Sequence, residues 1–188
     1  MNYPTGIKKE FLDSKKEREY KNLGMNLESD INSSNEYYIN KDKAYIYKKP
    51  TPIKLVKVDY QKGEIKEAYF EKPSTTDYNG IYRGRYIDFE AKETKLNYFP
   101  LSNIHNHQIE HLRKIINMGG IGFIIVRFTT LNQTYYLNGK ELFLFLESEN
   151  RKSIPLEFFK EKGYLLKDKL RPLIDYLEAV ERDWGCYE

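Results

Sequence analysis

The strongest hydrophobic pattern in the chain is the apolar run at residues 121–128, which predicts a central strand buried on both faces. The preceding segment, residues 102–118, carries apolar residues at helical spacing and predicts a helix with Ser102 as its N-cap. The buried stripe of this helix comprises Ile104, Ile109, Leu112, Ile115 and Ile116. The two segments together predict a helix packed on a central sheet.

Weaker patterns predict further helices and strands on both sides of this centre. Residues 85–92 predict a strand in which Phe89 and Ala91 enter the core, because side chains alternate between the two faces of a sheet. The remaining predicted elements are a helix at about 25–35, a strand at 44–47, a strand at 134–137 that turns at Asn138-Gly139, and helices at 141–146, 155–160 and 171–181. This order predicts one α/β domain with a mixed central sheet.

Residues 53–70 predict a β-hairpin, with runs at 54–60 and 64–70 joined by a three-residue loop that ends in Gly63. The runs have limited apolar content, so the hairpin cannot fill a core by itself, and we expect it to project from the domain. A hairpin folded flat on the domain is the alternative. Residues 73–80 then predict a loop and turn.

The composition fits a folded domain, with 188 residues, 40% hydrophobic and 31% charged. No stretch approaches the roughly 18 apolar residues of a membrane span, so no membrane partner is expected. A lone cysteine, Cys186, fits a reducing cytoplasm. Residues 1–24 are dense in charges of both signs and predict a flexible arm, either solvated or ordered on a phosphate backbone, before a single domain at 25–188.

The net charge of +3 and the 17 tyrosines are compatible with nucleic-acid binding without identifying it. Tyrosine serves core packing as well as base stacking. Charge and composition therefore leave the function open, and the motifs must decide it.

The strongest chemical signal is Asp77 followed by Glu90 and Lys92. On the predicted strand, Asp88, Glu90 and Lys92 share one face, and such a face must be solvated, mutually paired or bound to a cation. If Asp77 arrives from a neighbouring strand, it and Glu90 offer the hard oxygen ligands that Mg²⁺ prefers. The alternative is a charged strand face that simply faces water.

This residue set suits phosphodiester hydrolysis. A metal ion can polarise the phosphate and generate hydroxide near neutral pH. The Lys92 ammonium can hold the attacking water or stabilise the negative charge that develops on phosphorus. The spacing therefore predicts a metal-dependent nuclease.

Several sequence blocks resemble the RecU family of Holliday-junction resolvases. They are Lys48-Lys49-Pro50-Thr51-Pro52, Glu67-Ala68-Tyr69-Phe70, Ser74-Thr75-Thr76-Asp77-Tyr78-Asn79-Gly80, Tyr86-Ile87-Asp88-Phe89-Glu90-Ala91-Lys92-Glu93-Thr94 and His107-Gln108-Ile109-Glu110-His111. The resemblance runs from about residue 25 to residue 176. It implies a restriction-endonuclease-like mixed central sheet flanked by helices, in a homodimer that cuts four-way DNA junctions symmetrically with Mg²⁺ during recombination and repair. Mn²⁺ is the expected substitute.

The resemblance also implies roles for individual residues. The metal site would comprise Thr75, Asp77, Glu90 and Gln108, with Lys92 as the transition-state stabiliser and Glu28 and Asp88 as outer carboxylates. An ordinary polar helix residue is the alternative for Gln108, and a plain exposed glutamate is the alternative for Glu28.

The hairpin at 53–70 would correspond to the family's stalk, which is implied to enter the junction centre. A basic protrusion could recognise the opening between four arms by shape. The phosphate-binding candidates are Lys48, Lys49, Lys54, Lys57, Lys62, Lys66, Arg83 and Arg85. A recombinase is a further expected partner. One departure concerns Leu23, where the family usually has an arginine, so a basic contact made there would be missing.

Other functions fit the sequence less well. His105, His107 and His111 suggest zinc, but they lack a nearby cysteine and an H-E-x-x-H motif. Gly119-Gly120-Ile121-Gly122 follows a helix, which is the wrong order for a phosphate-cradling loop. The rivals to a resolvase are a non-catalytic protein that binds junctions or modulates a recombinase, and a sequence-specific restriction enzyme on the same fold.

Overall fold

A mixed six-stranded sheet forms the centre of the molecule, with strands in the order β1-β4-β5-β7-β8-β10. The structure, a computed structural model, describes residues 26–71, 75–148 and 151–184. The sheet strands are β1 (Ala44–Lys48), β4 (Tyr78–Tyr82), β5 (Arg85–Thr94), β7 (Ile121–Phe128), β8 (Gln133–Asn138) and β10 (Tyr164–Leu166). Of these six strands, only β5 and β7 pair in parallel. The predicted α/β architecture with a mixed sheet is confirmed.

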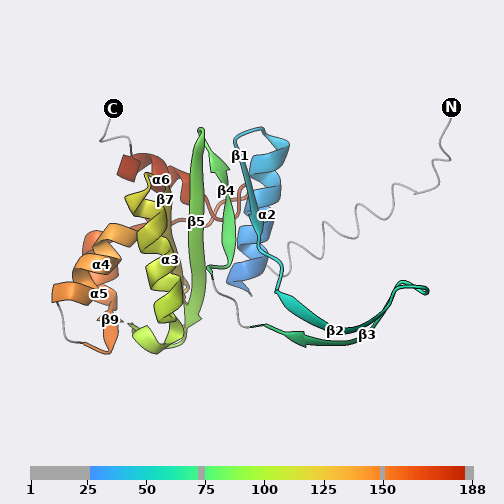
Figure 1. Cartoon of the computed structure of the whole chain (residues 1–188). Helices are drawn as coiled ribbons and strands as arrows, with labels where there is room; N and C mark the ends of the chain where they lie inside the picture. The colour runs from blue at the N-terminus through green and yellow to red at the C-terminus, as the bar shows by residue number, and fades with distance from the viewer. Residues whose placement is uncertain (1–25, 72–74, 149–150, 185–188) are drawn as a thin grey trace.

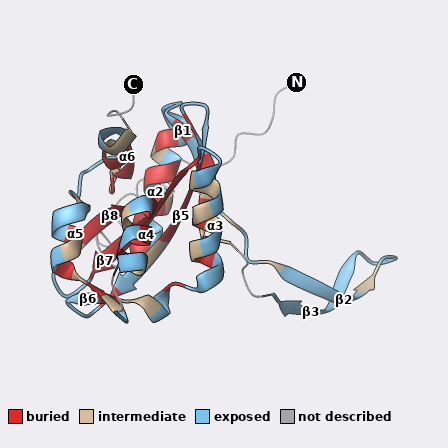
Figure 2. Cartoon of the chain, turned by 60° about the vertical axis from the view of Figure 1, so that its left-hand side comes forward, coloured by how far each residue is buried: buried red, intermediate tan, exposed pale blue. Residues whose placement is uncertain are grey.

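Helices cover both faces of this sheet (Figure 1). They are α2 (Leu27–Asn40), α3 (Asn106–Asn117), α4 (Gly139–Ser148), α5 (Leu156–Lys162) and α6 (Tyr176–Trp184). Outside the sheet, β6 (Tyr98–Pro100) pairs with β9 (Ser153–Pro155), and a 3₁₀ turn spans Leu101–Asn103. The helices and the small pair leave the sheet's centre fully enclosed (Figure 2).

Strand β7 separates two hydrophobic clusters, as its largely apolar sequence predicts. Every residue of β7 is buried. Phe123 and Ile125 pack with α2 and α6 on one face, while Ile124 and Val126 pack with α3 and α4 on the other. A strand buried on both faces needs apolar residues at successive positions, because neither face meets water.

Part of the tyrosine content serves this core. Tyr78, Phe89 and Phe123 stack with ring centroids 4.8 and 4.6 Å apart, and Tyr176 packs against both phenylalanines. Tyr38 and Tyr136 are also fully buried. These tyrosines are therefore packing residues and are not free to stack on bases.

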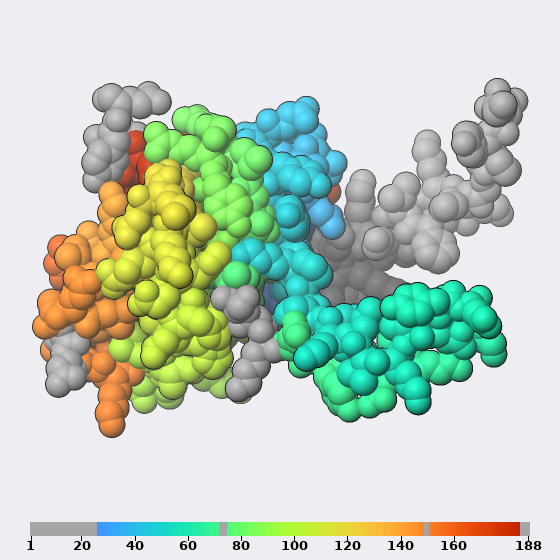
Figure 3. Space-filling view, in the orientation of Figure 1, coloured from blue at the N-terminus to red at the C-terminus, as the bar shows by residue number. Residues whose placement is uncertain are grey.

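A two-stranded hairpin, β2 (Ile53–Asp59) with β3 (Glu64–Phe70), stands clear of the body (Figure 3). Nearly all of its side chains are exposed. The prediction that it projects is confirmed, and the flat alternative is wrong. Its loop has four residues, Tyr60–Gly63, rather than three, and Gly63 adopts a left-handed φ of 66°. This projecting hairpin (residues 53–70) branches from the sheet directly after β1.

Two predicted helix starts are wrong. The helix expected from Ser102 begins at Asn106, because pairing of β6 with β9 holds the chain before it in another conformation. The last helix begins at Tyr176 rather than at 171. There Ile174 pairs with Asp168 in an isolated bridge and donates its N–H to the Ser34 hydroxyl.

Two turn predictions also differ from the structure. Residues 78–80, expected within a loop, belong to β4. Asn138-Gly139 makes no separate turn, since Gly139 is the first residue of α4. Gly139 lies against Ile116 and the Gly122 backbone, where a Cβ would come within 2.5 and 2.9 Å of neighbouring atoms. Close helix–strand packing, and not turn geometry, requires glycine at this position.

Among the described residues, no helix is both long enough and apolar enough to span a membrane.

Candidate active site

The register of one tight hairpin brings Asp77 and Glu90 together. Strands β4 and β5 are joined by Arg83-Gly84, both with left-handed φ values of 48° and 75°. Such a two-residue loop fixes the pairing of its strands. Tyr78 pairs with Phe89, so the next position sets Asp77 opposite Glu90, and the Asp77 N–H donates to Glu90 Oε2 at 3.1 Å. The spacing of the motif is therefore a consequence of hairpin register.

Lys92 completes the cluster from the same face of β5 as Glu90. Its ammonium forms an ion pair with Glu90 Oε1 and lies 3.8 Å from Asp77 Oδ2. The Glu90 side chain is fully buried, whereas those of Lys92 and Asp77 are 28% and 34% exposed. The alternative of a strand face that simply meets water is wrong, because Asp88 is fully buried as well.

The cluster contains two carboxyl groups but only one ammonium group. Burial, and after it the Asp77 carboxylate, raise the pKa of Glu90, while Lys92 lowers it, and the net result is a pKa of about 8. Glu90 Oε1 is buried and has no hydrogen-bond donor beside its ion pair with Lys92. Hard carboxylate oxygens in this state fit a divalent cation, which would replace the proton that Glu90 otherwise retains.

The raised pKa gives a stability prediction for Glu90→Gln in EDTA. The unfolded carboxyl ionises near 4.5 and the folded one near 8, so the wild-type fold loses stability as pH rises between these values. At pH 8 we expect the variant to have a higher melting temperature than wild type, by about 2–4 °C for each kcal/mol of folding stability regained. Near pH 5 we expect the two proteins to have the same melting temperature. Calorimetry at both pH values measures the difference. Equal melting temperatures at pH 8 would show that Glu90 is not held protonated.

A depression of about 210 Å³ opens beside Asp77 and Lys92. The N-terminus of α2 forms one wall, where the Leu27 N–H donates to Glu93 Oε1 at 2.7 Å. Glu28 lies in the same wall, but its carboxylate pairs with Lys48 at 2.6 Å. Glu28 is therefore brought beside the site, with its charge directed at the base of the projecting hairpin.

Thr75 and Gln108 each make a hydrogen bond outside the carboxylate cluster. Thr75 lies in a bend, so strand alternation does not relate it to Asp77, and its hydroxyl donates weakly to the Thr76 carbonyl at 3.5 Å. The buried Gln108 accepts the His105 N–H at 2.9 Å through its side-chain oxygen and so caps α3. Within the described part of the chain, no three His, Cys, Asp or Glu side chains form a metal cluster. The remaining ligands of a cation would be water, neutral oxygens or substrate phosphate.

The chain matches the family model RecU, Recombination protein U, over residues 22–182. It belongs to the RecU family. "Holliday junction resolvase RecU" of Pediococcus pentosaceus is 50% identical over 97% of this chain and 96% of its own length. The protein of the same name from Streptococcus thermophilus is 44% identical over 98% of both chains. A solved structure of Archaeoglobus fulgidus Hjc, a Holliday junction resolvase from an archaeal hyperthermophile, aligns with a TM-score of 0.43 and 10% identity over 69% of this chain and 90% of that one.

In this RecU chain, sequence reasoning missed a polar network around Asp88. Lys49 Nζ and Tyr86 Oη donate to Asp88 at 2.7 and 3.0 Å, and His111 Nε2 lies 3.2 Å away. The Thr76 hydroxyl donates to the other carboxylate oxygen. The sequence did contain one signal for this network, because Tyr86 and Asp88 occupy alternate positions of one strand and so share a face. The other three partners of Asp88 come from distant segments. The ammonium of Lys49, which was predicted to bind phosphate, contacts both Asp88 and Thr76.

The other predicted phosphate ligands of this RecU chain fall in two places. Lys54, Lys57, Lys62 and Lys66 lie on the projecting hairpin. Arg83 and Arg85 lie at the opposite end of the β4–β5 hairpin from Asp77, roughly 17 Å along the strand. There Arg83 pairs with Glu181 at 3.1 Å and Arg85 stacks on Trp184. The structure therefore does not bring the two arginines to the carboxylates.

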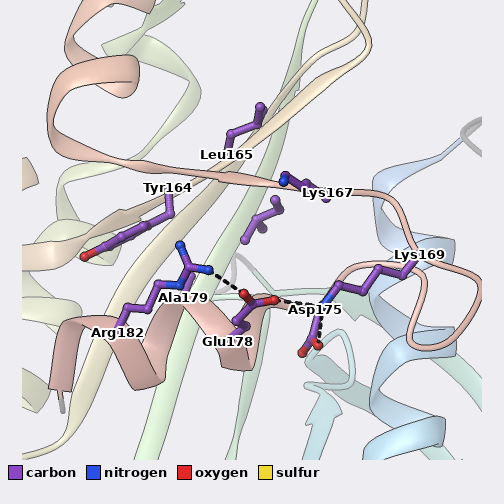
Figure 4. Close-up of a pocket in the computed structure, with 9 residues that line it drawn as sticks. Tyr164, Leu165, Lys167, Lys169, Asp175, Glu178, Ala179 and Arg182 are labelled. Atoms are coloured by element: carbon purple, nitrogen blue, oxygen red, sulfur yellow. Dashed lines mark hydrogen bonds and ion pairs between the residues drawn. The ribbon is translucent and has the colours of Figure 1, made fainter.

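Another cavity of the RecU chain, of about 260 Å³, lies between β10 and α6 (Figure 4). Four of its charged groups pair with each other: Lys169 contacts Asp175 and Glu178 at 3.1 and 2.7 Å, and Arg182 contacts Glu178 at 2.6 Å. Strand β10 is three positions from β5 in the sheet. This mutual pairing and distance leave the Asp77 cluster as the candidate site.

Proposed function

We propose that this RecU-family protein is a Holliday junction resolvase, an endonuclease that nicks four-way DNA junctions in pairs. The names of its relatives and their identity over nearly the whole chain support the activity. The observation that carries the chemistry is the convergence of Asp77, Glu90 and Lys92 in one partly open cluster. Two carboxylates with an adjacent ammonium are the groups that phosphodiester hydrolysis requires.

In this proposal Asp77 and Glu90 hold Mg²⁺, or Mn²⁺ in its place. The metal, when bound, supplies Lewis-acid activation of the phosphate. Thr75 and Gln108 remain proposed contributors of neutral oxygens or of hydrogen bonds to water, and Glu28 and Asp88 remain outer carboxylates. Lys92 lines the depression with a partly exposed side chain, and its ammonium would stabilise the charge that develops on the scissile phosphate.

The projecting hairpin is proposed to enter the junction. Its four lysines are opposed by Asp59, Glu64 and Glu67, so its formal charge is only +1. Lys66 is further engaged with Asp59 at 3.5 Å and Glu64 at 3.9 Å. General attraction to phosphate is therefore weak, and recognition would depend on where this narrow protrusion fits.

Replacing residues 54–69 with a short Gly-Ser turn tests this role. The hairpin contributes almost nothing to the buried core, so the melting temperature should change by no more than about 2 °C. We expect the preference for a four-way junction over linear duplex to fall by at least about tenfold, the equivalent of one good contact. Competition binding with both DNAs in EDTA measures the preference. An unchanged preference would remove the hairpin from junction recognition.

A homodimer is also proposed, because two strands of a two-fold junction must be cut and a C2 dimer matches that symmetry. The outer face of β1 and β4 exposes Tyr45, Tyr47 and Ile81, of which Tyr45 and Ile81 are direct cross-strand partners. The chain leads from β1 directly to the projecting hairpin. A second copy is the proposed occupant of this exposed face of β1 and β4, and sedimentation with Ile81→Glu tests it.

The activity itself is tested on a labelled four-way junction with Mg²⁺ or EDTA. The resolvase gives symmetric nicks in Mg²⁺ only. Binding without product in Mg²⁺ would favour the non-catalytic rival, and cutting of linear duplex at a fixed site would favour a restriction enzyme. A DNA substrate and a lone cysteine favour a cytoplasmic location, with a recombinase as a further proposed partner. The proposed arm at 1–24, with Leu23, lies outside the described residues, as does Cys186.

A further inference from the structure

Asp88 is a buried carboxylate that ties together separate parts of the chain. Its side chain has no exposed surface, and its four partners come from four places: the segment after β1, the bend before β4, the start of β5 and the middle of α3. Burying a charge is costly unless it is paired and hydrogen-bonded. The partners of Asp88 meet that requirement, so the network is a defined arrangement and not a chance contact.

The same network also contacts the backbone at Asp77. Thr76, which donates to Asp88, is the residue immediately before Asp77. Lys49, whose ammonium contacts both Asp88 and Thr76, also donates its backbone N–H to the Asp77 carbonyl at 2.8 Å. Thr76 and Asp77 precede the first residue of β4 and lie in a bent segment. Their position is therefore set by these side-chain and backbone contacts more than by the strand ladder.

We propose that Thr76, Asp88 and Lys49 are positioning residues that hold Asp77 opposite Glu90 in the geometry that binds the metal ion. The inference rests on the proposed function. Lys49 begins the four-residue connection from β1 to the projecting hairpin, so the same contacts tie the base of that hairpin to the site. Through its backbone N–H and its ammonium, Lys49 therefore links the position of the projecting hairpin to the position of Asp77.

The test replaces Thr76 with valine, which keeps the side-chain shape and removes the hydroxyl. Loss of an outer hydrogen-bond partner typically costs about 10–100-fold in metal affinity or activity. We expect the Mg²⁺ concentration for half-maximal cleavage to rise at least about tenfold, and the Mg²⁺-induced rise in melting temperature, measured without DNA, to weaken in parallel. Thr76→Ser should restore both, and junction binding in EDTA should stay within about twofold of wild type.

A matched control separates positioning from stability. Ser34 is equally buried and its hydroxyl bridges Asp30 and Ile174 on the α2 side of the sheet. Ser34→Ala should lower the melting temperature and leave both Mg²⁺ responses unchanged. If Thr76→Val does not fold, Lys49→Met, which keeps the aliphatic stem, takes its place with the same measurements.

Unchanged Mg²⁺ responses in the folded Thr76 or Lys49 variant would overturn the inference, as would an equal shift in Ser34→Ala. Failure of the proposed function gives a different pattern. A wild-type protein that never cleaves junctions would contradict the resolvase assignment, while its Mg²⁺-induced melting shift would still report whether Thr76 positions Asp77.

Discussion

Lys92→Ala is expected to reduce cleavage of a four-way junction by at least about 10²–10³-fold, the cost of removing one preorganised charge stabiliser. Lys92 lies on the same face of β5 as Glu90, and its side chain, which is 28% exposed, lines the depression beside Asp77. A lysine in this place can meet the scissile phosphate, whereas the ammonium of the half-buried Lys49 is engaged by Asp88 and Thr76. Single-turnover cleavage at saturating Mg²⁺ measures the loss.

Junction binding distinguishes lost chemistry from a lost contact. Lys92→Ala should bind the junction in EDTA within a few-fold of wild type, because one phosphate contact is a small part of the total attraction. Lys160→Ala, an exposed lysine on α5, is the matched control and should cleave normally. Cleavage by Lys92→Ala at the wild-type rate would exclude this mechanism.

The pairing of Asp77 with Glu90 was predictable from the sequence because it depends on local order. The two residues flank one hairpin, and its register follows from the turn at Arg83-Gly84. The strand that begins directly after Asp77, β4, was nevertheless missed. Asn79-Gly80 has the composition of a turn, and Gly80 is required instead because a Cβ would lie 2.0 Å from the Tyr45 carbonyl of β1. Glycine chosen for close strand approach is indistinguishable, in sequence, from glycine chosen for a turn.

The surroundings of the pair depend on contacts between distant segments and were not predictable in this way. Lys49 and Asp88 are 39 positions apart and meet only because β1 pairs with β4. In the sequence, Lys49 is one basic residue beside another, and exposure is the ordinary expectation for lysine. The contact made by Gln108 likewise depends on where α3 begins. Because the helix starts at Asn106, the side-chain oxygen of Gln108 accepts a hydrogen bond at the helix N-terminus.

Asp77→Ala is expected to abolish measurable Mg²⁺-dependent cleavage and also the Mg²⁺-induced rise in melting temperature. The variant keeps Glu90 and Lys92, which are left as a simple ion pair. The Asp77 charge raises the pKa of Glu90, so its removal lets Glu90 ionise at lower pH against the Lys92 ammonium. The variant should therefore be as stable as wild type, or more so, at pH 8 in EDTA.

This combination distinguishes a lost ligand from a damaged fold. A structural role for Asp77 predicts lower stability at every Mg²⁺ concentration, whereas a ligand role predicts that stability stops responding to Mg²⁺. Glu161→Ala, which removes an exposed carboxylate on α5, should keep both the response and the activity. An Asp77→Ala protein with a normal Mg²⁺ response would show that the cation binds elsewhere, since Glu90 alone, buried and neutralised by Lys92, is a poor site for a divalent ion.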